Sequence, residues 1–144
     1  QMCIREGQKL ISAIDGLKKE RLENFKTFLL FLPEGELHEM GLLFSAYLLK
    51  KYGHRVIYLG QSLPLADLKH VVKTRKPDIL LTFITSPMEG GIKNYFPPSF
   101  LALPSAQGNV AGLQSYNIDF AELKNVACLT CSADIKNLLS GAAA

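Results

Sequence analysis

The sequence predicts an α/β domain built on a parallel sheet, and three observations lead to this class. From Lys26 onward, short apolar runs alternate with segments of helical periodicity in the order β-α-β-α-β. The first run, Lys26 to Leu32, is uninterrupted, which is typical of a parallel strand buried on both faces. The chain has 144 residues, of which 48% are hydrophobic and 20% charged, enough for one core. Right-handed crossovers through helices are therefore expected.

The N-terminal segment has a different pattern. The spacing of residues 4–25 predicts one amphipathic helix. One face of this helix would be formed by Leu10, Ile14, Leu17, Arg21 and Phe25. A charged run, residues 18–21, supplies the solvated edge of this helix. We therefore divide the chain into residues 1–24, an N-terminal helix or linker that ends an upstream helical domain, and residues 25–141, the α/β domain.

The first half of the α/β domain contains three expected strands separated by two expected helices. The strands are expected at 26–32, 55–59 and 79–84, and the helices at 37–52 and 63–75. The first helix stops at Gly53 and should pack inward through Met40, Leu43, Phe44, Tyr47 and Leu48. Gly60-Gln61-Ser62 should form a turn, and Leu63-Pro64 should start the second helix.

The second half is less regular. A helix is expected at 88–95, a short helix at 119–124, a strand at 125–130, and a last helix from the cap Ser132 to Leu139. Residues 97–112 contain three prolines and two glycines, which interrupt strands. The fourth strand is therefore either near Phe100 to Leu103 or displaced toward Val110.

Composition excludes several classes of protein. The net charge of +3 is too small for a nucleic-acid face, and no apolar run reaches the roughly 18 residues of a membrane span. A cytoplasmic protein is expected. The three cysteines, Cys3, Cys128 and Cys131, lack the second pair that a zinc site needs, and are expected to be reduced and buried.

A histidine lies where the first strand should meet the following helix. The strand breaks at Pro33-Glu34-Gly35 into a loop that carries Glu36 and His38. Parallel sheets present ligand sites at the carboxyl ends of their strands, so this position favours a functional histidine. The alternative is a histidine that only caps or decorates the helix.

The loop Glu36 to Gly41, E-L-H-E-M-G, resembles the D/E-x-H-x-x-G signature of cobalamin-binding domains. The phrase H-R-V-I-Y-L-G-Q-S-L-P-L-A-D-L, which begins at His54, is similar to the second strand and helix of this module in MerR-type cobalamin-dependent transcriptional regulators. The resemblance covers most of residues 25–139. It implies a flavodoxin-like (Rossmann-type), five-stranded parallel sheet flanked by helices, here with an extra N-terminal helix.

The resemblance also implies roles for the loop. His38 would be the lower axial ligand of cobalt, and Glu36 would bind the other imidazole nitrogen. Gly41 would be the small residue past which the nucleotide tail of cobalamin runs. The phrase adds Ser62 and Leu63 to the expected cofactor-binding residues.

Two parts of the family pattern differ in this sequence. In place of the family's S-x-L element stands Phe83-Ile84-Thr85, with Thr82 and Thr85 as the nearby hydroxyls. In place of the G-G element stands Gly112-Leu113-Gln114. A phenylalanine cannot hydrogen-bond a base, and a leucine narrows a channel that glycine leaves open. Thr82, Thr85, Gly112 and Gln114 complete the set of expected cofactor-binding residues.

The preferred function is the cobalamin-binding sensory domain of a MerR-type regulator. The cofactor would be adenosylcobalamin or methylcobalamin, and the differences in the tail pocket leave open its loss. Two alternatives are a corrinoid-carrying module of a methyltransferase or mutase, and a cobalamin-free interaction domain of the same fold. DNA binding would require a domain outside this sequence, and a homo-oligomer is one expected assembly. The sequence lacks a P-loop or a catalytic constellation, so an independent enzyme is not expected.

Overall fold

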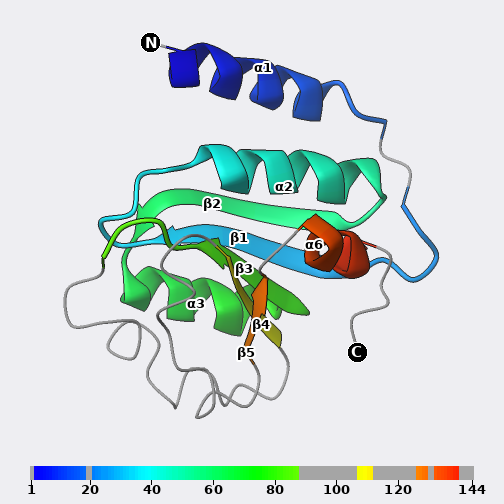
Figure 1. Ribbon diagram of the computed structural model, residues 1–144. Coiled ribbons are helices and arrows are strands. Elements are labelled where there is room, and N and C mark those ends of the chain that lie inside the picture. Colours follow the sequence, from blue (N-terminus) through cyan, green and yellow to red (C-terminus); the bar gives the residue numbers. More distant parts are fainter. Residues whose placement is uncertain (1, 19–20, 88–106, 112–125, 130–131, 140–144) are drawn as a thin grey trace.

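The chain folds around a five-stranded parallel sheet with the strand order β2-β1-β3-β4-β5 (Figure 1). The computed structural model describes residues 2–18, 21–87, 107–111, 126–129 and 132–139. The strands are β1 (Thr27–Pro33), β2 (Arg55–Leu63), β3 (Ile79–Phe83), β4 (Gln107–Ala111) and β5 (Val126–Leu129). All four strand pairings are parallel. The predicted fold class, a flavodoxin-like α/β sheet flanked by helices, is confirmed.

Helices cover both faces of the sheet, and a further helix forms an outer layer (Figure 1). They are α1 (Met2–Asp15), α2 (Met40–Lys51), α3 (Leu65–Arg75) and α6 (Ser132–Leu139). Side chains from α2 and α6 share one buried cluster with β1 and β3, while α3 lies on the opposite face. The outer helix is α1, which packs on α2 at the buried Gly7. A Cβ at Gly7 would lie 3.7 Å from Leu43 and 3.8 Å from Met40.

The central strand β1 explains why this sequence folds as a two-sided sheet. Its residues Phe28 to Leu32 are all at most 1% exposed. Because successive strand side chains point to opposite faces, one set (Phe28, Leu30 and Leu32) joins the cluster with α2 and α6. The intervening Leu29 and Phe31 face the α3 side, so the uninterrupted apolar run buries side chains on both faces.

The N-terminal helix is shorter than predicted. It ends at Asp15, and Gly16 and Leu17 close its last turn by donating to the carbonyls of Ser12 and Ile14. Residues 21–25 are exposed and non-helical. The expected helix face does not continue to Phe25, which is 38% exposed and lies outside the helix.

Strand β2 is longer than predicted. It continues through Gly60-Gln61-Ser62, where a turn was expected, and pairs Phe31 with Gly60 and Pro33 with Leu63. Register shifts accompany these pairs, and φ is +79° at Gly60 and +50° at Ser62. The extra residues of β2 are therefore absorbed as bulges within the ladder, with no turn.

The inward face of α2 also differs from the prediction. Phe44, expected to point inward, is 49% exposed, whereas Leu42, Leu43, Ala46 and Leu49 are buried. The reason is that α2 is buried on two sides. Leu42, Ala46 and Leu49 pack in the cluster with the sheet, and Leu43 lies against α1 at Gly7.

For the fourth strand, the alternative near Val110 is confirmed by β4. The helices expected at 88–95 and 119–124 lie outside the described residues. None of the helices in the described ranges has the length and apolar character needed to cross a membrane.

Candidate functional site

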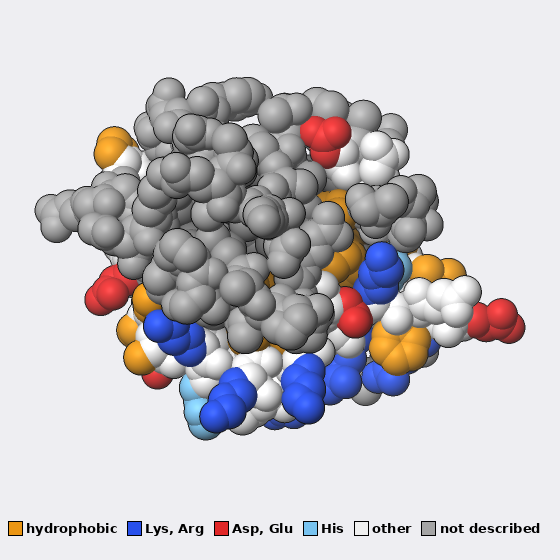
Figure 2. Space-filling view, turned by 90° about the horizontal axis from the view of Figure 1, so that it is seen from below, with side chains coloured by type: hydrophobic (Ala, Val, Ile, Leu, Met, Phe, Trp, Pro, Cys, Tyr) orange, Lys and Arg blue, Asp and Glu red, His pale blue; other side chains and the backbone are white. Residues whose placement is uncertain are grey.

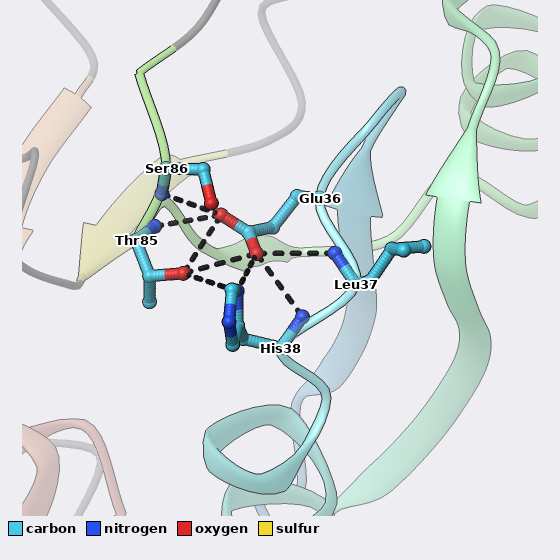
Figure 3. Close-up of polar contacts among 5 residues, drawn as sticks. All are labelled: Glu36, Leu37, His38, Thr85 and Ser86. Atoms are coloured by element: carbon cyan, nitrogen blue, oxygen red, sulfur yellow. Dashed lines mark hydrogen bonds and ion pairs between the residues drawn. The ribbon is translucent and has the colours of Figure 1, made fainter.

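The loop that joins β1 to α2 carries a cluster of polar contacts at the carboxyl end of the sheet (Figure 3). The loop turns directly after β1, where the Glu36 N–H donates to the carbonyl of Pro33 at 2.9 Å and Gly35 has φ of +85°. Thr85 and Ser86 follow β3, which is the neighbour of β1. Strand order therefore brings together residues about fifty positions apart in the sequence.

Glu36 is the centre of the cluster. Its side chain is 3% exposed, and its carboxylate accepts backbone N–H groups from Leu37 (3.1 Å), His38 (3.0 Å), Thr85 (2.7 Å) and Ser86 (2.9 Å). Burial raises the pKa of Glu36, but the hydrogen bonds from Thr85, His38 and Ser86 outweigh it and lower the pKa from 4.5 to about 2. Glu36 is therefore a carboxylate at neutral pH.

His38 is oriented by this carboxylate. Its Nδ1 lies 2.7 Å from Glu36 Oε1, and because a carboxylate only accepts, Nδ1 carries the proton. The hydroxyl of Thr85 lies 2.8 Å from the same Nδ1 and 3.0 Å from both oxygens of Glu36, to which it donates. This tautomer leaves a lone pair on Nε2, and the His38 side chain is 69% exposed.

The end of β2 supports the loop from the other side. Ser62 Oγ accepts the N–H of Gly35 at 3.2 Å, and the Ser62 N–H donates to the carbonyl of Glu36 at 3.2 Å. Leu63 pairs with Pro33 at the end of the ladder. The structure thus places these two predicted site residues beside the loop, where they brace its backbone.

Gly41 lies in the first turn of α2 against the ring of Phe83. A Cβ built on Gly41 would lie 3.0 Å from Phe83 Cε1, closer than side chains normally approach. Thr82 is the neighbour of Phe83 along β3, so its side chain points to the opposite face of the sheet. It is 2% exposed, and its hydroxyl has no hydrogen-bond partner within the described ranges. Thr82, a predicted site residue, therefore does not join the cluster around His38.

Some contributions could not be read from the sequence. Ser86 and Leu37 act through backbone N–H groups, which any residue supplies. Glu39, which follows His38, accepts the Tyr58 hydroxyl at 2.6 Å. Burial and the neighbouring Glu39 raise the pKa of Tyr58, so the phenol remains a donor that ties α2 to β2. Of the predicted residues, Gly112 and Gln114 lie outside the described part of the chain.

Comparisons with known proteins give matches at the level of structure. No family model matches the sequence, and no curated protein matches it. Among solved structures, a methanol:cobalamin methyltransferase complex from Methanosarcina barkeri aligns with a TM-score of 0.63, 17% identity and 81% coverage of this chain. The chain has the fold of cobalamin-binding domains.

Two further solved structures agree. The monomethylamine corrinoid protein of Methanosarcina barkeri aligns with a TM-score of 0.61, 16% identity and 94% coverage of this chain. A cobalamin-binding protein from Desulfitobacterium hafniense DCB-2 aligns with a TM-score of 0.61, 19% identity and 93% coverage. This chain spans 47%, 63% and 66% of the three matched chains.

Proposed function

We propose that this domain binds a corrinoid and that Nε2 of His38 would be the protein ligand of its cobalt. One observation carries the proposal: an exposed imidazole at the carboxyl end of the sheet whose Nδ1 is held, at 2.7 Å, by a buried carboxylate. Histidines that bind metals are commonly oriented in this way, through the nitrogen that does not bind the metal. The donor set of the cluster therefore fits a cobalt ligand.

The remaining residues of the cluster have defined roles in this proposal. Glu36 and Thr85 hold the proton on Nδ1 and so keep the lone pair on Nε2. Leu37, 60% exposed next to His38, offers an apolar contact for a large planar ligand. A bound corrinoid would supply an organometallic bond between cobalt and carbon, a chemistry that protein side chains lack.

We further propose that the domain is a carrier, which presents the corrinoid to the active site of a partner. The similarity to a corrinoid protein and to a chain of a methyltransferase complex supports this function. It replaces the sensory domain of a regulator as the preferred function. In this proposal the cluster binds and orients the corrinoid, and the partner supplies the catalytic groups.

The regulator remains the second candidate because of the phrase Tyr58 to Leu68. In the structure, this phrase forms the end of β2 and the start of α3, where Ser62 braces the loop of His38. This segment therefore holds the His38 loop in place, which a carrier and a regulator would both require. Its sequence alone does not favour the regulator.

Two measurements distinguish the candidates. Corrinoid binding is measured by titration with cobalamin under visible absorption, and saturable binding with an altered spectrum is expected. The mass of the complex is then measured by light scattering with adenosylcobalamin, in the dark and after illumination. A carrier keeps the same mass in both. A larger mass in the dark that falls on illumination would favour the sensor, and an absence of binding would favour the cobalamin-free interaction domain.

A further inference from the structure

A second candidate site lies at the end of the sheet opposite to His38. His38 follows the carboxyl end of β1, whereas Arg55 begins the parallel neighbour β2. Near Arg55, a cavity of about 360 Å³ opens between the end of α1, the chain after it and the last turn of α2. Its volume lies at the lower end of the range for small-molecule sites.

The walls of this cavity carry a concentrated positive charge. Among the described residues that line the cavity, the cationic ones are Lys18, Arg21, Lys50 and Arg55, and the acidic one is Asp15. Among the residues that the structure describes, none of these four cations forms an ion pair. The guanidinium of Arg21 lies 5.2 Å from the centre of the Phe25 ring, a cation–π contact that does not neutralise its charge because the ring carries no net charge. Like charges so arranged favour the binding of an anion.

Helix ends explain only part of this charge. Lys50 is in the last turn of α2, where a cation balances the helix dipole. Arg55 is on a strand, and Lys18 and Arg21 follow α1 without belonging to it. The dipole of α2 therefore accounts for the position of Lys50 and not for the other three cations.

The cavity also has an apolar part. Ile14, Leu17 and Val56 line it together with His54. Both nitrogens of His54 are engaged, since Nδ1 accepts the Lys26 N–H at 3.3 Å and Nε2 donates to the carbonyl of Leu139 at 2.8 Å. His54 therefore acts as a fixed wall, and recognition of an anion falls to the four cations.

We propose that this cavity binds a small organic phosphate. Its phosphate would lie on the guanidinium groups of Arg21 and Arg55, whose planar arrays of N–H donors match phosphate oxygens, with Lys18 and Lys50 adding charge. The organic part would contact the apolar side chains. The inference does not depend on corrinoid binding, because the two sites lie at opposite ends of the sheet.

The test uses phenyl phosphate and inorganic phosphate as probes with the full chain. Binding is measured by calorimetry at constant ionic strength, and the site is located by the backbone amide NMR shifts of Gly53 to Val56. We expect saturable 1:1 binding, with phenyl phosphate several-fold tighter than inorganic phosphate because its ring buries apolar surface. The variant Arg21→Gln/Arg55→Gln should weaken binding roughly tenfold or more.

The matched control is Lys69→Gln/Lys73→Gln on α3, which removes the same charge from exposed positions on the other side of the sheet. Lys and Arg side chains lie along one edge of the face seen from below (Figure 2). The control therefore tests whether the loss of any two surface charges weakens binding. The control should bind phenyl phosphate like the wild type. The proposal is overturned if both double variants weaken binding equally, if binding is not saturable, or if inorganic phosphate binds as tightly as phenyl phosphate.

Discussion

Glu36 shows how a single residue gives the loop its chemistry. The resemblance of this loop to the D/E-x-H-x-x-G signature implied that Glu36 pairs with His38, and in the structure the two side chains lie 2.7 Å apart. The N–H groups of Thr85 and Ser86 could not be predicted as partners, because they come from a distant loop and carry no side-chain signal. The Thr85 N–H nevertheless lowers the pKa of Glu36 more than any other hydrogen bond, and the Ser86 N–H adds to this effect.

The role of Glu36 in the site can be tested by Glu36→Gln. An amide keeps the shape but loses the charge that holds the proton on Nδ1, so cobalamin binding should weaken roughly ten- to a hundredfold. The exposed Glu34 in the same loop provides a matched control, since Glu34→Gln makes the same chemical change outside the cluster. Spectral titration gives both affinities. Equal affinities for the two variants would remove Glu36 from the site.

The same carboxylate should make stability depend on pH. The pKa of Glu36 is lowered from 4.5 to about 2 in the folded state, so its stabilisation is complete above pH 4.5 and is lost as pH falls toward 2. The difference corresponds to about 3 kcal/mol. Urea unfolding at several pH values should show a steeper loss of stability for wild type than for Glu36→Gln in this range. Parallel curves would show that Glu36 is not responsible.

Phe83 is the residue that departs most clearly from the family pattern. Its ring covers Gly41, beside which the nucleotide tail of cobalamin is expected to pass. We expect Phe83→Ser to tighten the binding of cobalamin by roughly tenfold, while the affinity for cobinamide, which lacks the tail, stays the same. Phe44→Ser, at an exposed position on α2, is the control. A similar gain for both ligands would show that the ring does not block the tail.

At the level of elements, β2 shows where local sequence patterns mislead. Gly60-Gln61-Ser62 has the composition of a turn, yet it continues the strand because pairing with Phe31 and Pro33 outweighs the local preference. The same extension brings Ser62 to the loop of His38. The prediction of the strand was therefore too short for a reason that also positions the site.

Gly60 should be essential for this extension. Its φ of +79° disfavours a side chain, so Gly60→Ala should lower the free energy of unfolding by about 1 to 2 kcal/mol. Gly16→Ala is a suitable comparison, because a Cβ there would lie 3.6 Å from the nearest backbone oxygen, an ordinary contact. Urea unfolding measures both. If the two substitutions cost the same, the bulged end of β2 is not under the constraint described.

At the level of the whole molecule, the class of fold followed from periodicity, because a chain of alternating strands and helices has few right-handed solutions. The order of strands and the pairing of β1 with β3 explain the site, since they bring Thr85 to His38. The end of α1 was not predicted, because the apolar spacing continues to Phe25 whereas the last helical turn closes at Gly16 and Leu17. The candidate site could be described only with both the signature of the loop and the geometry of its hydrogen bonds.

The measurement that tests the central claim most directly compares the visible spectra of wild type, His38→Ala and His70→Ala with cobalamin, from about pH 5 to 8. His70 is an exposed histidine on α3 and serves as the control. Wild type and His70→Ala should show the spectrum of histidine-ligated cobalt. His38→Ala should lack this spectrum at every pH. Identical spectra and affinities for wild type and His38→Ala would contradict the account.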